Sequence, residues 1–235
     1  MSSSPRRSSD EHPATLRVEA APNLSRVAYE RFKEALFERR LQPGAFMSQA
    51  ELVEIVGSPL GPLREALQVL QAEGLVTIRA RAGIEIAKPD LALVRNSYQL
   101  RLFLETPAIR HFAETAPRGR IEAMIAQHRE VIGWVDGADV DRDLARRIEE
   151  VDASLHLGAI DALDNPLLRK AFLQTQDYIR LIRLDHHYAY SAAKVRRTMA
   201  EHLEIFEACL ARNPDAAEAA LRAHLTQAIQ RAMGL

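Results

Sequence analysis

Residues 51–89 of the chain read ELVEIVGSPLGPLREALQVLQAEGLVTIRARAGIEIAKP, and this stretch decides the fold of the N-terminal part. Ser48, just before it, and Glu51 have the spacing of a capping box, in which each side chain bonds the other residue's backbone amide, so a short helix is predicted here. A further helix is expected to begin near Pro62, because proline is tolerated at the first helical position, and to end at Gly74. The stretch therefore predicts two helices joined by a tight turn.

Two short apolar segments follow, at 75–78 and 84–87, and the residues between them end in Gly83, which is typical of a β-hairpin. Upstream, apolar residues recur at three- and four-residue steps from Leu24 to the turn at 42–44, which predicts one more helix. Three helices and a two-stranded wing describe a winged helix-turn-helix. In that fold the second helix of the pair presents its N-terminal side chains to base edges in the major groove of DNA.

After Pro89 the chain shows helical periods alone, interrupted at Pro117, Gly137, Asn165 and Asn213. Each of the two asparagines precedes a proline, so each is predicted to cap a helix that the proline opens. A bundle of about six helices is expected. The fold class is therefore mostly α, with a winged helix-turn-helix followed by an all-α bundle.

Composition and length set the domain organisation. The chain has 235 residues, of which 47% are apolar, enough for two small cores. We expect a disordered tail at 1–20, a DNA-binding domain at 21–88 and a helical domain at 89–235. No apolar run is long enough to span a membrane, and the first residues lack the apolar stretch of a secretory signal, so a soluble, cytoplasmic protein is expected.

Net charge gives no support for nucleic-acid binding, because the formal value is −1. Any contact with DNA must come from locally placed arginines. Arg64 lies near the start of the predicted recognition helix. Arg79 and Arg81 alternate with alanines and would share one face of the wing, where they suit phosphate contact. For all three, the alternative is an arginine that only faces solvent.

Polar residues lie on apolar stripes of the predicted bundle. Ile148, Asp152, Leu155 and Ala159 step by four, three and four residues, so Asp152 should face the core. A buried carboxylate needs a partner, and His156 projects from the next turn of the same face.

Two later histidines, His202 and His224, border the inward stripes of their own helices. Three imidazoles and one carboxylate suit a divalent transition metal, for which zinc and nickel are the first candidates. Such a set leaves coordination positions open for a ligand. The alternative is a set of core histidines with ordinary hydrogen-bond partners.

Residues 24–88 resemble the N-terminal module of GntR-family transcription regulators, most specifically in PLREAL at 62–67 and EGLV at 73–76. The resemblance implies that Arg64 reads the major groove and that Gly83 is the wing-tip glycine that approaches the DNA backbone. Where the family usually has Ser-Arg-Thr before the proline, this chain has Pro-Leu-Gly at 59–61, so one arginine and two hydroxyls are missing.

The helical part resembles the FCD effector domain of the FadR-type GntR subfamily. The matching motifs are Asp152-Ala153-Ser154-Leu155-His156, Asn165-Pro166, Glu201-His202 and His224-Leu225. The resemblance implies that Asp152, His156, His202 and His224 are metal ligands. It also implies a small organic acid beside the metal, with Arg101 as its arginine contact, although Arg101 could equally pair with Glu105 one turn on. His111, His128, His186 and His187 match no ligand position, so we interpret them as surface or structural residues.

These features together predict a homodimeric transcription regulator, most simply a repressor, that binds a palindromic operator in double-stranded DNA under control of the acid. Two alternatives remain. One is a metal-dependent hydrolase-like enzyme, although we find no nucleophile motif or phosphate-binding loop. The other is a protein that keeps the regulator fold but has lost specific DNA binding, since the segment 59–61 lacks the usual polar side chains.

Overall fold

The structure is a computed structural model that describes residues 23–136, 140–185 and 191–234. Its helices are α1 (Leu24–Phe37), α2 (Gln49–Val56), α3 (Leu60–Ala72), α4 (Leu91–Thr115), α5 (Arg118–Trp134), α6 (Arg142–Asp161), α7 (Pro166–Asp185), α8 (Ala192–Leu210) and α9 (Pro214–Met233). The strands are β1 (Phe46–Met47), β2 (Val76–Arg79) and β3 (Gly83–Ile86). The predicted tail at 1–20, the break at Gly137 and the two histidines at 186 and 187 lie outside the described residues.

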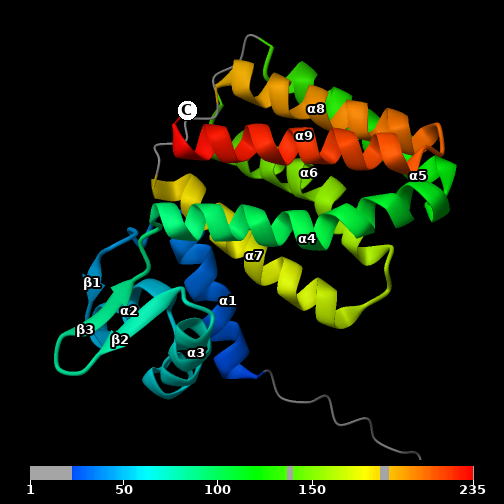
Figure 1. Ribbon diagram of the computed structural model, residues 1–235. Helices are drawn as coiled ribbons and strands as arrows, with labels where there is room; N and C mark the ends of the chain where they lie inside the picture. Colours follow the sequence, from blue (N-terminus) through cyan, green and yellow to red (C-terminus); the bar gives the residue numbers. More distant parts are fainter. Residues whose placement is uncertain (1–22, 137–139, 186–190, 235) are drawn as a thin grey trace, which may run out of the picture.

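The predicted fold class is confirmed. Helices α1 to α3 and a small sheet form the N-terminal part, and α4 to α9 form the bundle (Figure 1). The wing is a three-stranded antiparallel sheet in the order β1-β3-β2, with Val76 opposite Ile86. Strand β1 was not predicted, because two residues are too short to show an alternating pattern.

Local capping fixes several helix boundaries where the sequence predicts them. The Ser48 side chain accepts from the Glu51 amide at 3.2 Å, while the Ser48 amide donates to the Glu51 carboxylate at 2.7 Å. The Asn213 side chain accepts from the Ala216 amide at 3.0 Å. The predicted start of α3 is wrong by two residues, since α3 begins at Leu60. Proline fits there because amides of the first helical turn need no intrahelical partner.

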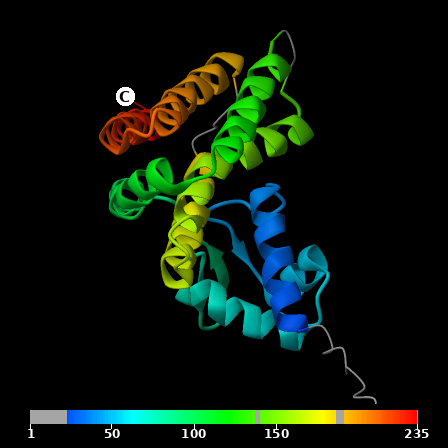
Figure 2. The same cartoon turned by 90° about the vertical axis from the view of Figure 1, so that its right-hand side faces the viewer.

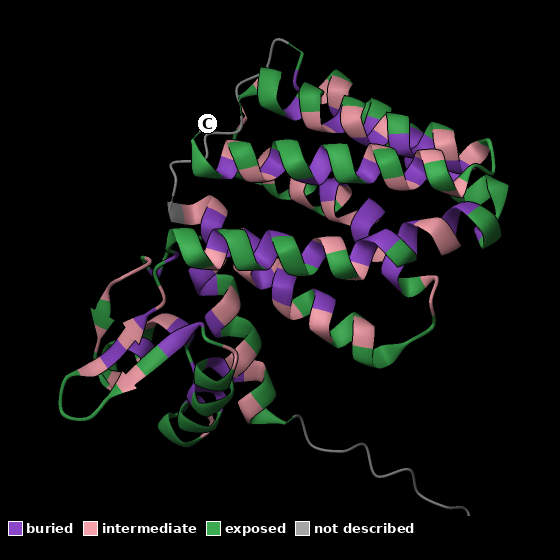
Figure 3. Cartoon of the chain, in the orientation of Figure 1, coloured by how far each residue is buried: buried purple, intermediate pink, exposed green. Residues whose placement is uncertain are grey.

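The bundle buries its apolar side chains between helices, as the purple faces in Figure 3 show. Helix α4 packs mainly against α9, α7 and α6, and α8 packs against α9 and α5. None of the described helices is both long and apolar enough to cross a membrane.

Helix α7 joins the two parts of the molecule, and Figure 2 shows it between the N-terminal part and the rest of the bundle. Its Leu181 is fully buried in the core of the N-terminal part. The Tyr178 hydroxyl donates to the backbone carbonyl of Glu73 at the end of α3, at 2.7 Å. Lys33 of α1 and Asp177 of α7 form an ion pair of 2.6 Å. A shift of α7 would therefore change its contacts with α1 and with the end of α3.

Candidate metal and ligand site

Three histidines from three helices meet inside the bundle. His156 of α6, His202 of α8 and His224 of α9 are all buried, and one ring nitrogen from each lies within 4.8 Å of the other two. The Nε2 atoms of His202 and His224 are 3.3 Å apart. The structure thus brings together three of the four side chains that the sequence singles out as metal ligands.

Two of the rings are oriented by carboxylates. The Nδ1 atom of His156 lies 2.6 Å from Glu105, and Nδ1 of His224 lies 2.7 Å from Glu201. A carboxylate can only accept, so each Nδ1 carries the proton. When an imidazole carries its one proton on Nδ1, its Nε2 is left with a lone pair.

Burial keeps two of the rings neutral. It lowers the pKa of His156 to about 4, although Glu105 opposes the effect, and it lowers the pKa of His202 well below the usual range. Neutral imidazole is the form that binds metal ions.

Asp152 borders the same cluster. Its Oδ1 lies 3.8 Å from Nε2 of His202, and its Oδ2 accepts from Arg183 of α7 at 2.9 Å. The predicted burial of Asp152 is correct, but its hydrogen-bond partner is Arg183, because His156 turns toward Glu105 instead. Burial would raise the pKa of Asp152, yet the Arg183 guanidinium outweighs it and holds that pKa below its usual range.

The donor set fits a divalent metal. Two nitrogen ligands about 2.0–2.1 Å from one zinc ion, at the tetrahedral angle, lie about 3.3–3.4 Å apart. The two Nε2 atoms of His202 and His224 have this separation. Outer contacts that orient each ligand are also typical of metal sites.

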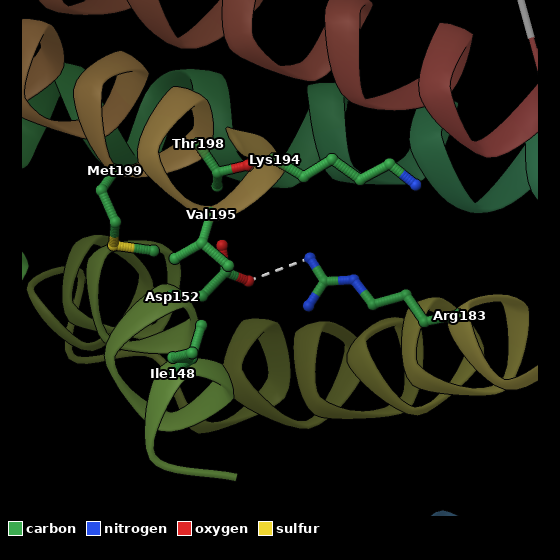
Figure 4. A pocket seen from close by; sticks show the side chains of 7 residues that line it. All are labelled: Ile148, Asp152, Arg183, Lys194, Val195, Thr198 and Met199. Atoms are coloured by element: carbon green, nitrogen blue, oxygen red, sulfur yellow. Dashed lines mark hydrogen bonds and ion pairs between the residues drawn. The ribbon is translucent and has the colours of Figure 1, made fainter. Parts of the chain in front are cut away.

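A small pocket with a cavity volume of about 20 Å³ opens beside Asp152. It is lined by Ile148, Asp152, Arg183, Lys194, Val195, Thr198 and Met199. Figure 4 shows the Asp152–Arg183 ion pair on one side, with the side chains of α8 facing it across the pocket. Asp152 therefore lies between this pocket and the histidines, and the pocket carries two cationic side chains and one hydroxyl.

Arg101 is part of the buried network. It is 2% exposed, and its Nε lies 2.5 Å from Glu105, which in turn contacts His156. The sequence left two roles open for Arg101, a contact with the effector or an ion pair with Glu105, and the structure contains the ion pair. An effector contact by Arg101 would have to compete with this ion pair.

The predicted DNA-contacting residues lie on the surface of the N-terminal part. Arg64 is exposed on α3 and donates to the side chain of Gln49 at 2.8 Å. Arg79 pairs with Glu85 across the wing at 2.8 Å. Arg81 lies in the turn with a positive φ of 65°, so the extended alternation that would place it on one face with Arg79 does not continue there.

Gly83 has a structural role that the sequence did not predict. Its φ is +103°, and a Cβ atom there would lie 2.7 Å from the carbonyl oxygen of Met47. Glycine is needed because β1 approaches the backbone of β3 at this point.

Two side chains that contact the cluster were not identified as its neighbours from the sequence. His128 of α5, interpreted from the sequence as a surface or structural residue, is fully buried, and its Nε2 lies 3.1 Å from Nδ1 of His202. Its place on the apolar stripe with Met124, Ile125 and Val131 was an available signal. Arg183 gave no comparable signal, because its pairing with Asp152 depends on how α6 and α7 pack.

Known proteins resemble the chain along most of its length. Residues 24–86 match the family model described as "Bacterial regulatory proteins, gntR family", and residues 96–227 match the FCD domain. Among curated proteins, the chain is 24% identical to the uncharacterized HTH-type transcriptional regulator YdhC of Bacillus subtilis, over 83% of this chain and 85% of YdhC. It is 26% identical to the HTH-type transcriptional repressor NanR of Klebsiella aerogenes, over 92% and 88%.

Solved structures share the fold. A putative transcriptional regulator GntR from Rhodococcus sp. RHA1 superposes with a TM-score of 0.70 at 19% identity, covering 91% of this chain and 99% of the other. At that identity, the likeness concerns the fold alone.

Proposed function

Because this chain belongs to the GntR family of bacterial regulatory proteins and carries an FCD domain, we propose that it is a repressor whose operator binding is controlled by a small organic acid bound beside a metal. As a family member it is a DNA-binding transcription regulator. The relatives are regulators as well, so the enzyme alternative is wrong. The name of one relative, a repressor, supports the proposed sign of regulation.

On the DNA side, the proposal assigns 21–88 to the operator-binding domain, with Arg64 reading base edges and Arg79 and Arg81 contacting phosphates. Arg64 is exposed near the start of α3, where a recognition helix carries its base contacts. Two copies would bind the half-sites of a palindromic operator. Exposed apolar side chains on one face of α4, Leu100 at 40% and Phe103 at 70%, support a surface that pairs with a second copy.

On the ligand side, the proposal assigns 89–235 to the effector-binding domain. The metal, for which zinc and nickel are the first candidates, would be held by Asp152, His156, His202 and His224. The observation that carries this assignment is the convergence of histidine nitrogens whose Nδ1 atoms are already bonded, which leaves Nε2 lone pairs facing one another. A metal bound there would supply a Lewis acid with open positions for an anionic ligand.

The proposed effector site is the small pocket next to Asp152, which would have to widen to admit an organic acid. Arg183 and Lys194 line it and give it positive charge, and a guanidinium suits a carboxylate with two oxygens. Arg183 already bonds Asp152, so an acid would bind within reach of both the arginine and the metal ligands.

Helix α7 supplies a route from this site to the DNA-binding part. Arg183 contacts Asp152, and Tyr178 and Leu181, further back along the same helix, pack on the N-terminal part. We propose that an acid which changes the contacts of Arg183 shifts α7 and so the separation of the two DNA-binding modules. By linkage, acid and DNA would each weaken the other by the same factor, typically about 5–150-fold.

The test is a mobility-shift titration with DNA from upstream of the protein's own gene, at two salt concentrations. Wild type should bind this DNA, and its affinity should decrease as the salt concentration rises. Arg64→Ala should lose the specific complex, whereas Arg118→Ala, which removes an equal charge at a distant exposed site, should keep it. If wild type binds neither this DNA nor the DNA of adjacent promoters at low salt, the result would favour the alternative that the protein keeps the regulator fold but has lost specific DNA binding.

The control by effector is tested on the same complex with small mono- and dicarboxylic acids. A regulator of the proposed kind should release the DNA with at least one acid, and Lys194→Ala should weaken that response without weakening DNA binding itself. A Lys194→Ala protein with an unchanged acid response would place the effector elsewhere.

A further inference from the structure

His128 makes contacts at both ring nitrogens. Its Nδ1 lies 2.8 Å from the backbone carbonyl oxygen of Met124, one turn earlier in α5, and its Nε2 lies 3.1 Å from Nδ1 of His202. The edge of the ring packs against Phe206, with ring centroids 4.9 Å apart. The ring is thus fixed in orientation by three neighbours.

These contacts determine which nitrogens carry protons. A carbonyl oxygen can only accept, so Nδ1 of His128 must be the donor. An imidazole that carries its proton on Nδ1 has an acceptor lone pair on Nε2, so Nε2 of His128 is the acceptor in its 3.1 Å contact with His202. His202 must then donate from Nδ1, and its own Nε2 lone pair points toward Nε2 of His224.

We propose that His128 is a positioning residue that fixes the tautomer and ring orientation of His202 so that Nε2 of His202 faces the metal. The inference rests on the proposed function of the cluster as a metal site. It completes a pattern, because Glu105 orients His156 and Glu201 orients His224 through the same Nδ1 atom. His202 differs in having a neutral acceptor, which adds no further negative charge to the buried site.

The variants separate orientation from packing. His128→Phe keeps a ring of similar shape against Phe206 but removes the acceptor for His202. His128→Gln keeps a side-chain carbonyl that can accept. His111→Phe is the matched control, because His111 is a partly exposed histidine of α4, whereas His128 is fully buried. Circular dichroism and thermal unfolding establish that each variant is folded.

Two measurements decide the proposal. The first is zinc affinity, determined by competition with a chromophoric chelator. Loss of an outer contact to a metal ligand typically costs about 10–100-fold in affinity. His128→Phe should show that loss, His128→Gln should recover most of it, and His111→Phe should match wild type. A His128→Phe protein that binds zinc within twofold of wild type would overturn the proposal.

The second measurement is nitrogen NMR of the histidine rings in chelator-treated protein, which reports the tautomer of His202 without metal. Wild type should show protonated Nδ1 and unprotonated Nε2, and His128→Phe should show a mixture. An unchanged tautomer in His128→Phe would contradict the inference. If wild type binds no zinc, the metal assignment fails, and the NMR result still decides whether His128 sets the tautomer of His202.

Discussion

Replacing Arg101 by methionine is expected to destabilise the protein strongly. The Arg101 and Glu105 side chains are 2% and 1% exposed, so the substitution leaves Glu105 as a buried carboxylate that still contacts His156 but has lost its cationic partner. Removing one partner of a buried ion pair typically costs about 3–5 kcal/mol. For a chain of this length, each kcal/mol lowers the unfolding temperature by about 2 °C, so a decrease of roughly 6–10 °C is expected.

The assay is thermal and urea unfolding of Arg101→Met beside Arg146→Met. Arg146 and Glu150 have the same four-residue spacing on a helix but are 65% and 62% exposed, so that substitution should cost about 0.3–0.5 kcal/mol. The double substitution Arg101→Met, Glu105→Met should be less destabilising than Arg101→Met alone, because it leaves no unpaired charge. If Arg101→Met is as stable as wild type but loses its response to acids, Arg101 contacts the effector and the reasoning from burial fails.

Gly83→Ala should destabilise the N-terminal part by about 1–3 kcal/mol in urea unfolding, because its Cβ would lie 2.7 Å from the Met47 carbonyl at a φ of +103°. Gly119→Ala, in open space on a helix, should not destabilise, and equal effects would refute the steric argument. Tyr178→Phe removes the 2.7 Å hydrogen bond to Glu73, so it should lower the free energy of unfolding by about 1 kcal/mol and reduce the coupling between acid and DNA binding. Unchanged coupling would exclude this contact from the proposed route through α7. Chelation should lower the unfolding temperature of wild type by about 5 °C if metal at about 100 times its dissociation constant supplies about 2.7 kcal/mol, and no shift would mean that metal does not stabilise the fold.

Local chemistry is what made parts of the fold predictable. The capping box of Ser48 and Glu51 and the caps of Asn165 and Asn213 each involve side chains and amides within three residues. Such contacts follow from sequence spacing alone. The burial of Asp152, His156, His202 and His224 was predictable for a similar reason, because helical periodicity places each on an inward face.

The partners of those side chains were not predictable, because they come from other helices. Glu105 and His156 are 51 residues apart, and His128 and His202 are 74 residues apart. Periodicity shows that His128 faces inward, but the identity of the facing helix depends on how α5 packs against α8. The expected pairing of Asp152 with His156 was wrong because each side chain found a closer partner across an interhelical contact.

The most direct test of the central claim is the metal content of purified protein after dialysis against zinc, measured by elemental analysis. Wild type should retain about one equivalent per chain. The double substitution His202→Ala, His224→Ala should retain almost none while staying folded, and His111→Ala should match wild type. Equal metal content in wild type and the double variant, or none in wild type, would contradict the assignment of a metal to these histidines.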